Sequence, residues 1–140
     1  MSLDLEALET SFDLVAPRGD ELMDEFYGRL FAAAPSVRPL FPEDMRAQKT
    51  MLLGALVLLR KSLRNLDAIV PKLHELGARH VAYGARPEHY PVVGEALIAS
   101  MAAVAGDAWE PRFGTSWSKA FEMVAGAMLA GAAEAEREAA

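Results

Sequence analysis

Apolar side chains in this sequence follow the spacing of α-helices. They recur at every third or fourth position along almost the whole chain, whereas the alternating pattern of a half-buried strand is almost absent. Turn residues interrupt the pattern, for example at Pro17-Arg18-Gly19 and at Gly106-Asp107. The sequence therefore predicts an all-α protein of six or seven helices.

Capping residues and prolines set the expected helix starts, which are Ser2, Asp20, Pro35, Asp44, Asp67, Pro87 and Pro111. The last three helices are expected to end at about residues 83, 105 and 133, leaving a frayed tail over about 134–140. In the helix capped by Asp44, Met51 and Leu52 are expected on the core-facing side. The helices have unequal lengths and tight corners, which suit crossing angles of roughly 50° and can leave an internal pocket.

Composition limits the classes of function. At 140 residues the chain fits one domain, 1–140, and its net charge of −6 argues against nucleic acid and anionic membranes as partners. Cysteine is absent, which excludes disulfides, zinc fingers, iron–sulfur clusters and thiolate haem ligation. The longest apolar run, Met51 to Leu59, is too short to span a bilayer, and no signal-peptide pattern opens the sequence. A cytoplasmic location is expected.

His80 is the first candidate for chemistry. It shares a helix face with Leu73 and Leu76 near the predicted helix end, where a histidine is either a structural core residue or a metal ligand. No second histidine lies three or four residues away, so a zinc or di-iron site lacks its ligands. Haem needs only one protein ligand, because the porphyrin supplies four nitrogens. This feature alone leaves the structural and the metal-binding interpretations open.

Tyr27 and Gln48 lie on two other predicted helices. Taken singly, Tyr27 can present its hydroxyl to solvent and Gln48 can lie at the surface. Together they would place a phenol and an amide donor opposite His80, a pair that suits a bound dioxygen carrying partial negative charge.

Five motifs occur in an order and spacing that carry a family resemblance. They are "FYGRLF" (26–31), Pro35 followed by Leu40-Phe41, Gln48 before "MLL" (51–53), "LGARHVAYG" (76–84) and "HYPVVG" (89–94). The chain resembles a bacterial single-domain haemoglobin and is similar to the globin domain of flavohaemoglobins over residues 3–133. The resemblance implies a globin fold, a 3-over-3 helical sandwich around a haem pocket, with haem b as the cofactor.

The resemblance also implies roles for individual residues. His80 matches the proximal histidine that ligates iron, and Tyr27 and Gln48 match the distal pair that hydrogen-bonds bound ligand. The other implied haem contacts are Phe41, which stacks on the haem, Leu52 on the distal side, Arg79 at a propionate, Tyr90 and Val93. Tyr90 matches a tyrosine that supports the proximal histidine together with a glutamate. His89 is expected to be structural or to cap its helix.

The expected glutamate is where the sequence departs from the family pattern. Alignment of the last helix puts Ala132 at or near that position, and Glu134 lies two residues away. A carboxylate hydrogen-bonded toward the ligand's free N–H makes the imidazole a stronger donor to iron and favours O–O cleavage. His80 is therefore expected to be a weaker donor, which makes peroxidase activity less favoured.

The expected function is reversible binding of dioxygen, and also of nitric oxide and carbon monoxide, at a histidine-ligated iron. Nitric oxide dioxygenation is the expected turnover where an external reductase supplies electrons, because no flavin or nicotinamide domain follows in the sequence. One alternative is a haem-based gas or redox sensor acting through a separate partner, and another is a globin fold without haem. The expected oligomeric state is a monomer or a weak homodimer.

Overall fold

The computed structural model describes residues 3–139, which form six α-helices and four 3-10 helices without a strand. The α-helices are α1 (Leu5–Val15), α2 (Gly19–Ala33), α3 (Arg46–Ser62), α4 (Val70–Ala82), α5 (His89–Ala105) and α6 (Pro111–Ala139). The 3-10 helices are η1 (Ala16–Arg18), η2 (Pro35–Leu40), η3 (Leu63–Ile69) and η4 (Gly106–Ala108). The predicted all-α class is confirmed.

Polar caps and glycine set the helix ends. The side chain of Asp4 accepts a hydrogen bond from the backbone N–H of Ala7 at 3.1 Å and so caps α1. Ser2, the predicted cap, lies outside the described residues. Asp44 Oδ1 accepts from the backbone N–H of Arg46 at 3.0 Å at the start of α3. Gly106, with φ of 60°, ends α5 in a conformation that favours glycine.

Three helix bounds differ from the prediction. α4 begins at Val70 rather than Asp67, because Asn65 (φ −147°, ψ 55°) breaks helical geometry and the segment around it is 3-10 helix. α5 begins at His89, after a turn that contains Pro87. α6 continues to Ala139, so residues 134–139 are helical where a frayed tail was expected.

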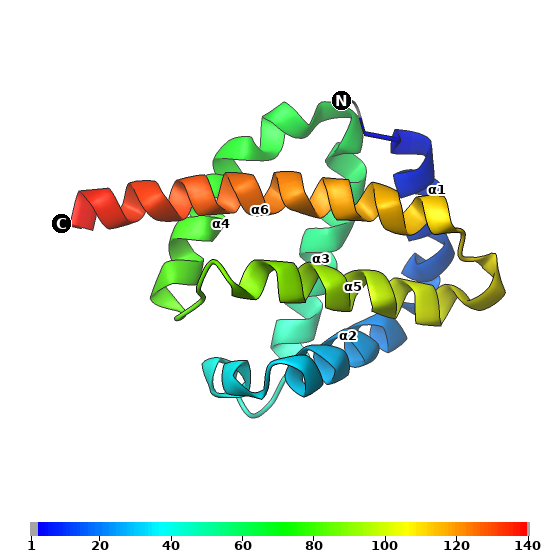
Figure 1. Cartoon of the computed structure of the whole chain (residues 1–140), viewed down its shortest axis with the longest axis horizontal. Coiled ribbons are helices and arrows are strands. Elements are labelled where there is room, and N and C mark those ends of the chain that lie inside the picture. Colours follow the sequence, from blue (N-terminus) through cyan, green and yellow to red (C-terminus); the bar gives the residue numbers. More distant parts are fainter. Residues whose placement is uncertain (1–2, 140) are drawn as a thin grey trace.

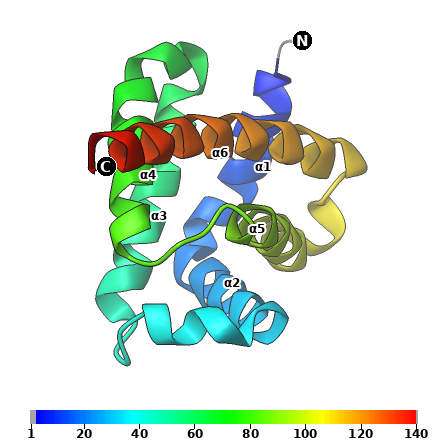
Figure 2. The same ribbon diagram turned by 60° about the vertical axis from the view of Figure 1, so that its left-hand side comes forward.

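The helices form two crossed layers of three (Figure 1). One layer holds α2, α5 and α6, and the other holds α1, α3 and α4. α6 crosses α4 in both views, and these two helices share an extensive contact (Figure 2). This arrangement confirms the predicted 3-over-3 sandwich.

A hydrogen bond and aromatic packing attach the last helix to the first. Trp117 of α6 is fully buried, and its Nε1–H donates to the Ser11 hydroxyl of α1 at 2.7 Å. Its ring also lies 6.3 Å from that of Phe12, centroid to centroid. A buried indole N–H needs such a partner, because leaving it unpaired would cost about 1–3 kcal/mol. Trp117 therefore fixes the position of α6 relative to α1.

α4 and α6 meet backbone to backbone at two glycines. A methyl group placed on Gly77 would lie 1.8 Å from the Met128 carbonyl oxygen, and one on Gly131 would lie 2.1 Å from the His74 carbonyl oxygen. Both distances are far below van der Waals contact, so neither position accepts a side chain unless the helices separate. The contact lies one helical turn before His80 and therefore sets where the last turn of α4 lies.

α5 is apolar over most of its surface, and its segment His89–Ala108 is long and apolar enough to cross a membrane by length and composition alone. The central helix of a globular protein meets the same criterion. α5 packs against α1, α2 and α6, and 28% of that apolar window is buried.

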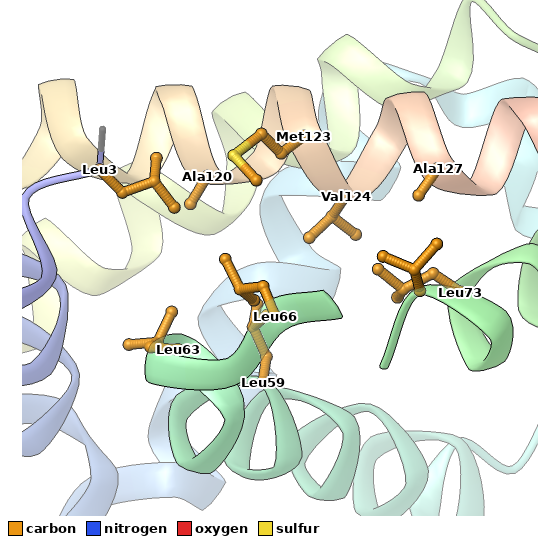
Figure 3. A pocket seen from close by; sticks show the side chains of 10 residues that line it. Leu3, Leu59, Leu63, Leu66, Leu73, Ala120, Met123, Val124 and Ala127 are labelled. Carbon is orange, nitrogen blue, oxygen red and sulfur yellow. The ribbon is translucent and has the colours of Figure 1, made fainter. Parts of the chain in front are cut away.

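A small apolar cavity of about 40 Å³ lies among the N-terminal segment, η3, α4 and α6 (Figure 3). Its lining is aliphatic, with Leu63 and Leu66 of η3 facing Val124 of α6 across the space. None of the residues predicted to form the functional site lines it. The cavity is therefore a packing feature separate from that site.

The glycine contact predicts the effect of adding a methyl group. Gly77→Ala and Gly131→Ala should each lower the free energy of unfolding by about 1–3 kcal/mol, because the added carbon forces two backbones apart. Gly126 is the matched control on α6, since a Cβ there meets no atom within 4 Å. Gly126→Ala should stabilise the helix by about 0.5–1 kcal/mol. Urea unfolding of the three variants measures these changes, and equal effects at Gly131 and Gly126 would contradict the contact.

Candidate functional site

Tyr27 and Gln48, which the sequence places together as the distal pair, are in direct contact with one another. Tyr27 lies on α2 and is 4% exposed, and Gln48 lies in the first turns of α3. Gln48 Nε2 donates a hydrogen bond to the Tyr27 hydroxyl oxygen at 3.1 Å. The hydroxyl accepts this bond, so its own proton remains available to donate to a further acceptor. The pair thus combines a phenol and an amide donor in an apolar region.

Three aromatic rings hold the Tyr27 ring in place. The centroid of Phe26 lies 4.8 Å away, that of Phe41 5.7 Å and that of Phe31 5.8 Å. Phe41 and Phe31 also contact one another edge to face at 5.4 Å. Phe41, predicted as a haem contact, is thereby placed next to the distal pair by the corner that follows η2.

Arg38 holds residues 41–43, the corner after η2, by hydrogen bonds, a role that the sequence did not predict. Its guanidinium donates to the carbonyl oxygens of Phe41, Pro42 and Glu43 at 3.3, 3.0 and 3.2 Å. It also lies 5.0 Å from the centroid of the Phe31 ring, within reach of a cation–π interaction. The single cation within the apolar and proline-rich stretch "PSVRPLF" was the available signal. Arg38 thus positions Phe41 against Tyr27.

Burial changes the acid–base behaviour of two tyrosines. Burial raises the pKa of the Tyr27 phenol above its ordinary value, and the hydrogen bond from Gln48 offsets part of this rise. Burial also raises the pKa of Tyr90 on α5. Both phenols therefore stay protonated at neutral pH, and Tyr27 remains a hydrogen-bond donor.

His80 lies in the last turn of α4, half-buried, with one ring nitrogen engaged. Its Nδ1 lies 2.7 Å from the carbonyl oxygen of Leu76, and since a carbonyl only accepts, Nδ1 carries the proton. In the neutral imidazole, Nε2 is then the nitrogen that carries no proton. Metal-ligating histidines in proteins use this arrangement, in which a carbonyl fixes the ring and its tautomer. The edge of the Tyr83 ring, 5.5 Å away, also contacts the imidazole.

The expected support of His80 by Tyr90 is replaced by a different bond. Tyr90 is half-buried on α5, and among the described residues no hydrogen bond joins it to His80. The single Nδ1 proton of His80 is already used by Leu76. Ala132, at the position where the family pattern has glutamate, is 7% exposed on α6. The ring orientation therefore comes from the helix that carries His80.

The remaining predicted residues lie on α3, α4 and α5. Leu52 of α3 and Val93 of α5 are half-buried and pack against the main core, whereas Arg79 is exposed. His89 has a structural role rather than a capping one, because its Nδ1 accepts from the backbone N–H of Arg86 in the preceding turn at 3.0 Å and α5 has no side-chain cap bond.

The polar groups of the site differ in how well they suit a free metal ion and the haem that the sequence implies. Within residues 3–139 no group of three histidine or acidic side chains is placed to hold a free metal ion. One imidazole with a free Nε2, two neutral hydrogen-bond donors and half-buried apolar walls do fit a flat cofactor that brings its own four metal ligands. The residues present therefore fit haem and not a bare metal ion.

Comparison with known proteins decides the family, because the Globin family model matches residues 24–128. The chain belongs to the globin family. It is 28% identical over 128 residues to a flavohemoprotein of Bacillus subtilis, covering 89% of this chain and 32% of that protein. A flavohemoprotein of Bacillus thuringiensis is 30% identical over 139 residues, 97% of this chain and 34% of the relative. The globin thus spans about a third of the length of these relatives.

Solved structures share the fold of this globin. A bacterial globin from Campylobacter jejuni superimposes with a TM-score of 0.81 at 22% identity, covering 93% of this chain and 94% of the other. An engineered carbene transferase, a candidate nitric oxide dioxygenase from Rhodothermus marinus, gives a TM-score of 0.86 at 21% identity, covering 98% and 97%. The family and its flavohemoprotein relatives imply that this globin binds haem and small gaseous ligands.

The raised pKa of Tyr27 predicts how stability depends on alkaline pH. The native state holds the phenol proton more tightly than the unfolded state, whose tyrosine titrates at about 10. Titration of Tyr27 therefore leaves the free energy of unfolding unchanged well below about pH 10. As the pH rises from there toward the native pKa, the free energy of unfolding falls. Tyr27→Phe should lose less free energy of unfolding than wild type between about pH 8 and pH 11.

Urea unfolding at a series of pH values checks this prediction. Tyr83→Phe is the control, because the Tyr83 side chain is 56% exposed and its replacement removes no buried hydroxyl. Part of the alkaline loss should remain in Tyr27→Phe, because Tyr90 is also buried with a raised pKa. Parallel pH curves for wild type and Tyr27→Phe would show that the Tyr27 phenol is not buried in solution.

Proposed function

We propose that this globin holds haem b through His80 Nε2 and binds dioxygen reversibly, with nitric oxide and carbon monoxide as further ligands. The observation that carries the proposal is the buried Tyr27 hydroxyl, 3.1 Å from Gln48 Nε2, with its own proton free. Burying the polar groups of this pair among aromatic rings costs free energy unless their protons are donated to a hydrogen-bond acceptor. A diatomic ligand that gains negative charge on binding is such an acceptor.

Haem would supply an iron that binds a diatomic molecule, and His80 would hold that iron. The Leu76 carbonyl fixes the ring of His80 through Nδ1 and leaves Nε2 for the metal. Phe41 would contact the cofactor, and Leu52 and Val93 would exclude water from it. We assign Arg79, exposed at the end of α4, to a haem propionate.

Tyr27 and Gln48 would retain the ligand by hydrogen bonds. Burial raises the pKa of the Tyr27 phenol, so the hydroxyl is protonated and can donate at neutral pH. A hydrogen bond to a charged acceptor contributes about 1.5–3 kcal/mol, which slows dissociation roughly ten- to a hundredfold. Such retention suits scavenging, storage or nitric oxide dioxygenation better than oxygen delivery.

The proximal side supports ligand binding over peroxide cleavage. The carbonyl oxygen of Leu76 is a neutral acceptor and withdraws the Nδ1 proton less than a carboxylate would. Ala132 offers no carboxylate on α6. We therefore propose that peroxidase activity is weak, and that nitric oxide dioxygenation proceeds only with electrons from an external reductase in the cytoplasm.

Ligand dissociation rates test the distal pair. Tyr27→Phe and Gln48→Leu should raise the oxygen dissociation rate roughly ten- to a hundredfold, because each removes a donor to the ligand. Carbon monoxide gains less charge, so its dissociation rate should change far less. Stopped-flow ligand replacement on the haem-loaded proteins measures both rates.

Tyr83→Phe serves as the control for loss of a tyrosine hydroxyl outside the pair, and its rates should equal those of wild type. Oxygen dissociation that is unchanged in both Tyr27→Phe and Gln48→Leu would overturn the assignment of these residues to the ligand.

A further inference from the structure

The outer face of α3 is apolar although it faces solvent. Residues 50–59, "TMLLGALVLL", hold no charged side chain, which is typical of a helix buried on all sides. Leu56 and Leu59 are buried in the core, but Met51 is 64% exposed and Leu58 is 42% exposed. Met51, predicted on the core-facing side, therefore lies on the opposite face. Together with Leu58, two turns further along, it forms an exposed apolar ridge.

A groove runs beside this ridge, between α3 and α2. Its volume is about 660 Å³, and its apolar lining includes Met23 of α2 with Leu53 and Val57 of α3. Its polar lining consists of Asp20 and Asp24 on α2 with Arg46, Lys49 and Thr50 on α3. Gly54 lies between the ridge and the groove, where a Cβ would meet no atom within 4 Å. A neighbouring backbone can therefore approach α3 closely at this glycine.

We propose that a second copy of this chain packs on this face, with the two α3 helices antiparallel about a two-fold axis at Gly54. A ridge beside a groove is self-complementary under such an axis, since each copy's ridge enters the other's groove. In this arrangement two residues face one another when they lie equally far from Gly54 in opposite directions along α3. Met51 therefore faces Val57 of the other copy, and Leu58 faces Thr50 of the other copy. Both ridge side chains thus leave solvent, Met51 against the apolar Val57 and Leu58 against the methyl-bearing Thr50.

The charges around the groove fit a second copy. Lys61 is exposed at the far end of the ridge and, within the described residues, makes no ion pair. The two-fold arrangement places it opposite Ala47 of the other copy, next to Lys49 and its partner Asp24. The Asp24 carboxylate bonds Lys49 Nζ at 2.8 Å and keeps 68% of its side chain exposed. Each copy's Lys61 therefore meets an accessible carboxylate of the other.

Other exposed apolar side chains do not form a comparable surface. Leu14 and Met123 lie on α1 and α6, and Leu40 of η2 lies close to Gly84, beside Tyr83 at the end of α4. Isolated apolar residues are normal on protein surfaces. The pairing of two α3 helices does not rest on haem binding, so it is tested separately from the proposed function.

Sedimentation equilibrium of the haem-loaded protein over a rising concentration series tests the dimer. Wild type should change from monomer to dimer between low micromolar and submillimolar concentration. Leu58→Glu and Met51→Glu should each raise the dimer dissociation constant about a hundredfold, since the change occurs twice across a two-fold interface at about tenfold per copy. Met123→Glu is the matched control, because Met123 is 50% exposed on α6, and it should associate like wild type.

A charge exchange tests the arrangement of the two copies. Lys61→Glu and Asp24→Lys should each weaken association, and the double variant should recover it to within a few-fold of wild type. A wild type that stays monomeric throughout, or a dimer that persists in Leu58→Glu and Met51→Glu, overturns the proposal. A double variant no tighter than the single variants overturns the antiparallel pairing. Helical circular dichroism of each variant establishes that it is folded.

Discussion

The backbone contact between α4 and α6 is the constraint on which the site depends. Gly77 and Gly131 let the two helices approach until no side chain fits between them, so α4 has little freedom to shift sideways. α6 is in turn fixed to α1 by the buried bond from Trp117 to Ser11. His80 lies one turn beyond Gly77. Its position is therefore set through three helices by contacts that involve no charged group.

The two sides of the site are built by different physical means. On the His80 side, close helix packing and the Leu76 carbonyl fix one imidazole with Nε2 free. On the other side, aromatic rings packed around Tyr27, together with Arg38 across the neighbouring corner, hold a phenol and an amide in contact. One imidazole as metal ligand and two neutral hydrogen-bond donors for the bound molecule are what the proposed reversible binding of a polarisable diatomic molecule requires.

Much of this was predictable from sequence, because the signals were local. Prolines, caps and apolar spacing gave the helix order, and the family resemblance gave Tyr27, Gln48 and His80. The break at Asn65 and the exposure of Met51 were missed, since a helix that is apolar on all sides does not reveal which face meets the core. The roles of Gly77 and Arg38 depend on which segments meet in space, information that no local pattern in the sequence carries.

The central claim is that His80 holds haem iron, and absorption spectroscopy of the haem-reconstituted protein tests it most directly. Ferric, dithionite-reduced and air-exposed spectra of wild type should show an intense Soret band and a lasting oxygenated form. His80→Ala should lose the oxygenated form, and added imidazole should restore a histidine-like spectrum by taking the place of the missing ring. Identical spectra for wild type and His80→Ala, or no Soret band in wild type, would contradict the claim.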